Sequence, residues 1–387
     1  MRCQHPSGMV RDWYEDSGTL AGPMRRHVVC LAGLVLFAVT LALAARFGPA
    51  VIFGLSLAAP TTEDWFAPIL KRATREEITL PAQSGRLQAD LYRPARPRGA
   101  LLLVHGLSRA GRRQPDLARL AHLLSQQGML VLVPQFEDLA AFQLTGREVD
   151  DVRAALRYTV TLNESAGIAG FSFGAGPALL AAADFPGLRV AASFGGYADL
   201  TLVIGYITTG AHQFAGQRYV QGQEEYNRWK LLALLVGFVQ QQPDHQRLDE
   251  IARRKLADPG DDTRQIEQAL GSEGRAVLAL VLNPREDAVS GLLAQLPPGA
   301  REALSRLSPL GAVSRIHARL LIAHGTADDS IPFTESLRLA AAAGHRAHLA
   351  LFRTFHHTGP KALWPSLSDR MHDGWNLLRL VDALLPR

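Results

Sequence analysis

The sequence predicts an α/β fold, a mostly parallel β-sheet with helices on both faces. Uninterrupted apolar runs of strand length, such as 100–104 and 129–134, alternate with segments of helical periodicity such as 148–159. Strands that are apolar throughout are buried on both faces, which is typical of a parallel sheet covered by helices. The chain has 387 residues, of which 47% are hydrophobic, so it is long and apolar enough to bury a large core.

The expected elements follow one another along the chain. A hairpin opens the folded domain, which we expect to span 74–387 after a linker at 60–73. Parallel strands and helices then alternate up to a helix at the C-terminal end. The expected strands are 77–81, 85–93, 100–104, 129–134, the run that leads to residue 171, 189–194, 318–323 and 349–359, and the first helices are 117–127 and 148–159.

An insertion interrupts this alternation. About 120 residues separate the strand 189–194 from the strand 318–323, and a simple crossover needs far fewer. Helical periodicity at 226–240 and 246–256 lies between them. We therefore expect residues 200–316, approximately, to form a helical cap inserted after the sixth strand.

Residues 24–59 are predicted to form a transmembrane anchor or a signal segment behind a polar tail at 1–23. The run 28–45 carries no charge, and about 18 apolar residues can just span a bilayer as a helix. The run is longer than the apolar stretch of most signal peptides, which favours an uncleaved anchor over a secretory signal cut near 42–44. A buried core helix is the remaining alternative, and Met24 is a second possible start of translation.

The charges that flank this segment predict its orientation. Arg11, Arg25 and Arg26 precede the apolar run, whereas Arg46 alone follows it closely. Positive charge is retained on the cytoplasmic side of a membrane. The bulk of the chain is therefore expected outside the cytoplasm, in the periplasm or the extracellular space.

Composition argues against several classes of function. The formal net charge of +5 comes from scattered arginines without a basic stripe that alternates with aromatic residues, so no nucleic-acid partner is expected. Both cysteines, Cys3 and Cys30, precede the folded domain, which therefore has no disulfide framework. No element carries ligands at metal-binding spacing, and Gly174 and Gly176 alone do not make a dinucleotide loop, so neither a metal nor a cofactor is expected.

The segment 167–182 reads as a strand, a turn around Ser172 and the start of an Ala- and Leu-rich helix. Gly170, Ser172 and Gly174 supply the pattern G-x-S-x-G, with glycines where strand and helix come too close for a Cβ atom. Free N–H groups at the helix N-terminus favour a negatively charged oxygen above the serine. The pattern predicts that Ser172 is the nucleophile of an acyl-transfer reaction.

A serine nucleophile needs an imidazole to accept its proton and a carboxylate to orient that imidazole. One late strand delivers Asp328 and Asp329, and the next delivers His356 and His357. The carboxyl ends of parallel strands lie at one edge of a sheet. We therefore expect these groups to converge with Ser172, and the chain order Ser, Asp, His fits this arrangement.

These motifs together resemble a known fold family. With His-Gly at 105–106, G-x-S-x-G, His-Gly-x-x-Asp at 324–328 and a late histidine, the segment 77–385 resembles the α/β-hydrolase fold, in particular its bacterial esterase-like and dienelactone-hydrolase-like members. The resemblance implies a Ser-Asp-His triad with Asp328 as the acid. It favours His357 over His356 as the base, because the histidine of this family tends to precede a short polar turn.

The same resemblance implies an oxyanion hole made by the backbone N–H groups of Leu107 and Phe173. Asp199 is a rival acid, and its alternative role is to start a cap helix. His105 and His324 each precede a glycine at a strand end, and we interpret both as histidines that shape a loop through local hydrogen bonds.

The sequence thus predicts a membrane-tethered serine hydrolase that cleaves an ester, thioester or amide through an acyl-enzyme. A small-molecule or lipid-like ester is the expected substrate, and acyl transfer to an acceptor other than water would use the same residues. The alternative is a membrane-tethered, non-catalytic binding protein on the same scaffold. The sequence leaves the acyl chain length and the oligomeric state open.

Overall fold

The computed structural model describes residues 21–58, 63–66, 70, 72–83, 85–356, 359–360 and 366–386. Residues 1–20 of the polar tail, half of the linker at 60–73 and the whole of His357 lie outside these residues. The chain divides into two compact units, Met1–Pro49 and Ala50–Arg387. The second unit contains the β-sheet and the cap.

An eight-stranded sheet forms the centre of this unit, in the order β1-β2-β4-β3-β5-β6-β9-β10. β2 pairs antiparallel with β1 and with β4, and the other neighbours pair parallel. This is an α/β-hydrolase fold, as the sequence predicts. The strands are β1 (Ala73–Ala82), β2 (Gly85–Pro94), β3 (Gly99–Val104), β4 (Met129–Pro134), β5 (Ala166–Phe171), β6 (Val190–Phe194), β9 (Arg319–Gly325) and β10 (Ala347–Phe352).

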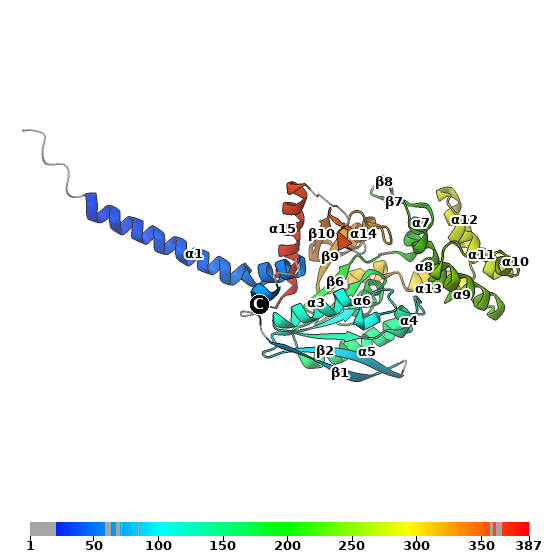
Figure 1. Ribbon diagram of the computed structural model, residues 1–387, viewed down its shortest axis with the longest axis horizontal. Helices are drawn as coiled ribbons and strands as arrows, with labels where there is room; N and C mark the ends of the chain where they lie inside the picture. Colours follow the sequence, from blue (N-terminus) through cyan, green and yellow to red (C-terminus); the bar gives the residue numbers. More distant parts are fainter. Residues whose placement is uncertain are drawn as a thin grey trace, which may run out of the picture. The chain divides into compact units, whose positions relative to one another are not determined.

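Helices cover both faces of the sheet (Figure 1). Neighbouring residues of β3 face opposite layers, because side chains alternate along a strand. Leu101 and Leu103 pack with α3 (Pro115–Gln126) and α15 (Leu367–Leu384). The other layer, which contains Leu102, is made by α5 (Arg147–Leu162), α6 (Ala175–Ala182) and α14 (Phe333–Ala343). Two separate apolar cores therefore enclose the sheet.

The cap lies between β6 and β9, as predicted for an insertion after the sixth strand. Most of it is helical, and Figure 1 shows these helices gathered beside one end of the sheet. A short hairpin that the sequence analysis did not predict follows the first cap helix. The cap elements are α7 (Leu200–Thr209), β7 (Ala211–Phe214), β8 (Gln217–Val220), α8 (Glu225–Val236), α9 (Gln242–Ala257), α10 (Arg264–Gln268), α11 (Ser272–Leu282), α12 (Val289–Gln295) and α13 (Pro298–Arg306).

The N-terminal apolar segment forms one helix, α1 (Ala21–Ala58). Among the described residues, Cys30–Leu57 is the stretch that is long and apolar enough to cross a membrane. Its last turns belong to the second unit, where Phe53 is buried in the core with α3 and α15. The Arg119 side chain of α3 donates hydrogen bonds to the carbonyls of Ser56 and Leu57. The alternative of a buried core helix therefore applies to this end of α1 alone.

The last predicted strand is shorter than expected. β10 ends at Phe352, and the chain bends before a separate pair of short strands, β11 (Phe355–His356) and β12 (Gly359–Pro360). The Asp373 carboxylate of α15 accepts hydrogen bonds from the amides of Arg353 and Thr354. These amides cannot continue the sheet, so the single strand predicted at 349–359 is wrong. The remaining short helices are α2 (Glu63–Phe66) and α4 (Glu137–Ala140).

Candidate active site

Ser172 lies at the turn between β5 and the helical segment that leads into α6. Its φ angle is +51°, a left-handed conformation that few residues other than glycine adopt. Such strain persists only where the surrounding structure enforces it, and it is concentrated at functional sites. The turn therefore has the geometry of a nucleophile elbow.

Glycines make this turn possible. A Cβ atom at Gly170 would lie 2.5 Å from the Cα of Ala175, and one at Gly174 would overlap the carbonyl of His105. At Gly106, a Cβ would lie 2.9 Å from the Cβ of Ser172. The sequence analysis predicted the close approach at Gly170 and Gly174, whereas the role of Gly106 is apparent only in the structure.

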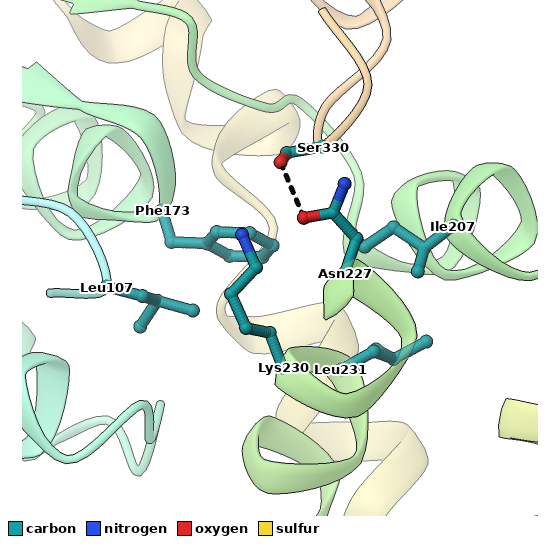
Figure 2. Close-up of a pocket in the computed structure, with 7 residues that line it drawn as sticks. All are labelled: Leu107, Phe173, Ile207, Asn227, Lys230, Leu231 and Ser330. Atoms are coloured by element: carbon teal, nitrogen blue, oxygen red, sulfur yellow. Dashed lines mark hydrogen bonds between the residues drawn. The ribbon is translucent and has the colours of Figure 1, made fainter. Parts of the chain in front are cut away.

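The two predicted oxyanion residues line the same small hollow, where their side chains lie near each other (Figure 2). Its volume is about 10 Å³, which is room for about one water molecule. Phe173 lies in the first turn of its helical segment, where amides have no partner inside the helix. In the described part of the chain, the Leu107 amide donates no hydrogen bond. The described residues that line the hollow are Leu107, Phe173, Ile207, Asn227, Lys230, Leu231 and Ser330.

His105 fixes the loop that carries Leu107. Its Nδ1–H donates to the carbonyl of Gly106 at 2.8 Å, and its Nε2 accepts the amide of Phe136 at 3.0 Å. Only the neutral ring can make both bonds. Burial lowers the pKa of His105 to about 4, although the bond to the Gly106 carbonyl favours the charged form. His105 is thus a neutral loop-shaping histidine, as interpreted from the sequence.

Asp328 lies in the loop that follows β9, and it is 3% exposed. Its Oδ1 accepts the amides of Ser330 and Ile331 at 2.8 and 3.0 Å. Its Oδ2 lies 3.4 Å from Nε2 of His324. That histidine hydrogen-bonds the carbonyl of Ile331 and the hydroxyl of Ser336, so it also shapes its loop locally.

The cap holds this loop, residues 327–330, which we name the acid loop. Three cap side chains donate hydrogen bonds to three consecutive carbonyls of the acid loop. The donors are Gln221 to the carbonyl of Ala327 at 2.8 Å, Tyr206 to that of Asp328 at 2.6 Å, and Asn227 to that of Asp329 at 3.0 Å. No pattern in the sequence predicts these contacts, because the donors and the acid loop are about 100 residues or more apart in the chain and meet only on folding.

The rival acid, Asp199, is the N-cap of α7. Its carboxylate accepts the amide and the hydroxyl of Thr201 at 2.8 and 2.7 Å. The buried Glu335 accepts the backbone amides of Ala198 and Asp199 and so holds the start of this helix. Asp199 therefore has the helix-starting role that the sequence analysis gave as its alternative.

The described residues place only part of the predicted histidine region. The backbone of His356 lies in β11, which contacts β9, the strand that leads to the acid loop. The side chain of His356 and the whole of His357 lie outside the described residues. The choice between them as the base therefore stays a prediction. Within the described part of the chain, no cluster of three or more His, Cys, Asp or Glu side chains could hold a metal ion.

Neither a protein-family model nor a curated protein sequence matches the chain. Among solved structures it is similar to the esterase domain of a Rhodothermus marinus protein, with 17% identity over 80% of this chain and 96% of that one (TM-score 0.44). It is also similar to a Pyrobaculum calidifontis esterase, with 14% identity over 89% and 93% of the two chains (TM-score 0.45).

A third similar structure is the acylaminoacyl peptidase of Pyrococcus horikoshii, with 14% identity over 82% of this chain (TM-score 0.44). The chain spans 41% of the length of that peptidase. These similarities concern the fold, and the function rests on the residues of the chain itself.

Proposed function

We propose that the protein is a serine hydrolase that cleaves an ester through an acyl-enzyme formed on Ser172. The observation that carries the proposal is the left-handed backbone of Ser172 at a helix N-terminus, in a turn where neither Gly170 nor Gly174 has space for a Cβ atom. A turn that only reversed the chain would not need to hold a serine in a strained conformation.

The proposed reaction has two steps. The hydroxyl of Ser172 attacks the ester carbonyl carbon and loses its proton to His357, which then protonates the departing alcohol. Water, activated by the same imidazole, cleaves the acyl-enzyme and releases the acid and the free serine. Asp328 holds the imidazole in the orientation that the transfer requires, and the amides of Leu107 and Phe173 bind the negatively charged oxygen.

Several contacts support this assignment. Leu107 and Phe173 line the same hollow, and Phe173 directly follows the serine in the chain. His105 fixes the first of these residues, and the start of the helical segment fixes the second. Asp328 is buried at the end of a strand parallel to the one that leads to Ser172. A preorganised site of this kind stabilises charge without reorganisation during the reaction.

A fluorophosphonate probe tests the nucleophile directly. The wild-type protein is expected to react with the probe and Ser172→Ala is not, with hydrolysis of p-nitrophenyl esters falling by about 10³-fold or more. Ser125→Ala is the matched control, because Ser125 is buried in α3 among residues of the other core. His357→Gln should abolish hydrolysis and His356→Gln should retain it. Absence of labelling in the wild-type protein would instead support a non-catalytic binding protein.

We further propose that α1 anchors the protein in a membrane with the second unit outside the cytoplasm. The support is the apolar stretch Cys30–Leu57 together with the excess of arginine before it. A tethered hydrolase would meet esters at a bilayer, so lipid-like esters are candidate substrates. Activity against p-nitrophenyl esters of increasing chain length tests this, since a short-chain optimum would contradict it.

A further inference from the structure

We propose that Lys230 forms an anion-binding subsite beside the nucleophile, and that the substrate is an ester with a carboxylate a few bonds from the scissile carbonyl. The inference deepens the proposed function and rests on it. It concerns a cap side chain that neither the motifs nor the resemblance identified.

The position of Lys230 is the first argument. It extends from α8 of the cap into the hollow that Leu107 and Phe173 line (Figure 2). In this view its ammonium group points away from the α8 backbone and toward the ring of Phe173. A charged group at this place lies in the hollow that both predicted oxyanion residues line, so it can contact substrate atoms close to the reacting carbonyl.

The second argument is that the Lys230 ammonium lacks a hydrogen-bond acceptor among the described residues. In the part of the chain that the structure describes, Lys230 makes no hydrogen bond or ion pair, and the ring of Tyr226 lies 5.1 Å from its Nζ. Burial lowers the pKa of the Lys230 ammonium, against the attraction of the carboxylates of Asp329, Asp328 and Glu224. A half-buried ammonium with three donors costs free energy unless an acceptor reaches it. A substrate anion would supply that acceptor.

The other polar groups of the hollow are already occupied. The Asn227 side chain donates to the carbonyl of Asp329 and accepts the hydroxyl of Ser330 at 3.0 Å (Figure 2). The amide of Ser330 donates to Asp328. The remaining lining side chains, Leu107, Phe173, Ile207 and Leu231, are apolar. Within this lining the Lys230 ammonium therefore keeps more uncommitted N–H donors than the Asn227 amide, which has one left.

The chemistry of one ammonium group favours a carboxylate as its ligand. Phosphate monoesters carry more charge and three terminal oxygens, which arginine forks bind better than a single point charge does. A carboxylate needs one strong charge-assisted hydrogen bond, and such bonds discriminate by about tenfold or more. The hollow holds about one water molecule, and one carboxylate oxygen can take the place of that water.

Pairs of charged and neutral esters test the proposal. The substrates are the mono-p-nitrophenyl esters of glutaric and adipic acid, each paired with its methyl ester, which has the same chain without the charge. We expect the ratio of kcat/KM, charged over neutral, to fall at least tenfold in Lys230→Met, mainly through KM. Lys230→Arg should retain most of the ratio. Lys255→Met, which alters a lysine of the neighbouring α9 that binds the Pro259 carbonyl, should not change it.

A binding measurement separates this proposal from the proposed function. Monomethyl glutarate is titrated calorimetrically into Ser172→Ala and into the same variant that also carries Lys230→Met. We expect binding to weaken at least tenfold in the second protein, whether or not the wild-type protein hydrolyses esters. Equal affinities, an unchanged ratio in Lys230→Met, or equal losses for both members of each ester pair would overturn the subsite. An inactive wild-type protein whose Ser172→Ala variant still binds through Lys230 would overturn only the proposed function.

Discussion

His105 couples the candidate site to pH, because it can hold the loop of Leu107 only while its ring is neutral. Its pKa is about 4 in the folded protein against 6.5 as the ordinary value, so the unfolded chain binds the proton more readily. The contribution of this histidine to stability is therefore complete above pH 6.5 and is lost as the pH falls from 6.5 to about 4. We expect a loss on the order of 2–3 kcal/mol over this range.

Urea unfolding at a series of pH values measures this effect. His212, whose pKa burial also lowers to about 4, contributes in the same range, so the comparison must be between proteins. His105→Gln is expected to be less stable than the wild type at neutral pH and to lose less stability on acidification. Parallel curves for the two proteins would show that His105 is not the group that titrates.

At the scale of elements, the cap is joined to the acid loop by the side chains of Tyr206, Gln221 and Asn227. Tyr206→Phe removes one of these hydrogen bonds, to the carbonyl of Asp328, and keeps the ring that packs edge-on against His212. We expect kcat to fall about tenfold with little change in KM. The transition state would lose about 1.4 kcal/mol of stabilisation, because Asp328 would be held less firmly in place.

Tyr219→Phe is the matched control for this prediction, because Tyr219 stacks on the ring of His212 and its hydroxyl makes no hydrogen bond within the described residues. Steady-state kinetics and the rate of fluorophosphonate labelling should be unaffected in the control. If Tyr206→Phe lowers the melting temperature without slowing either reaction, the bond stabilises the cap and does not position the acid loop.

An element could be predicted from the sequence where the residues that determine it lie within the element itself. The runs that became β3 and β4 are apolar throughout, so burial on both faces could be predicted from the sequence, and the glycines around Ser172 predicted the sharp turn. The end of β10 could not be predicted, because the carboxylate that bends the chain there belongs to Asp373, twenty residues further on. For the same reason the cap side chains that reach the acid loop left no pattern in the sequence.

At the scale of the whole molecule, α1 divides into an exposed part and a buried part that its composition does not distinguish. Side chains from Cys30 to Arg46 are exposed or partly exposed, whereas Ala50, Phe53 and Ser56 are 1–3% exposed within the second unit. Positions three apart lie on one face of a helix, so the last turns of α1 pack like any other surface helix. The stretch before them has about 20 residues, and at about 1.5 Å per residue it matches a hydrocarbon core of about 30 Å.

Two truncations test this division. A chain that begins at Pro49 lacks the exposed apolar stretch and keeps the packed turns, so it should be soluble and as stable as the full-length protein. A chain that begins at Ala59 also loses the buried Phe53 and the carbonyls that Arg119 binds, and it should be less stable by about 3 kcal/mol or more.

The full-length protein should stay with membranes through a carbonate wash, since a spanning helix is not released by salt or high pH. Protease added to intact spheroplasts should digest the second unit if it lies outside the cytoplasm. Recovery of a soluble protein whose N-terminus falls near residue 44 would contradict the anchor and establish cleavage of a signal segment.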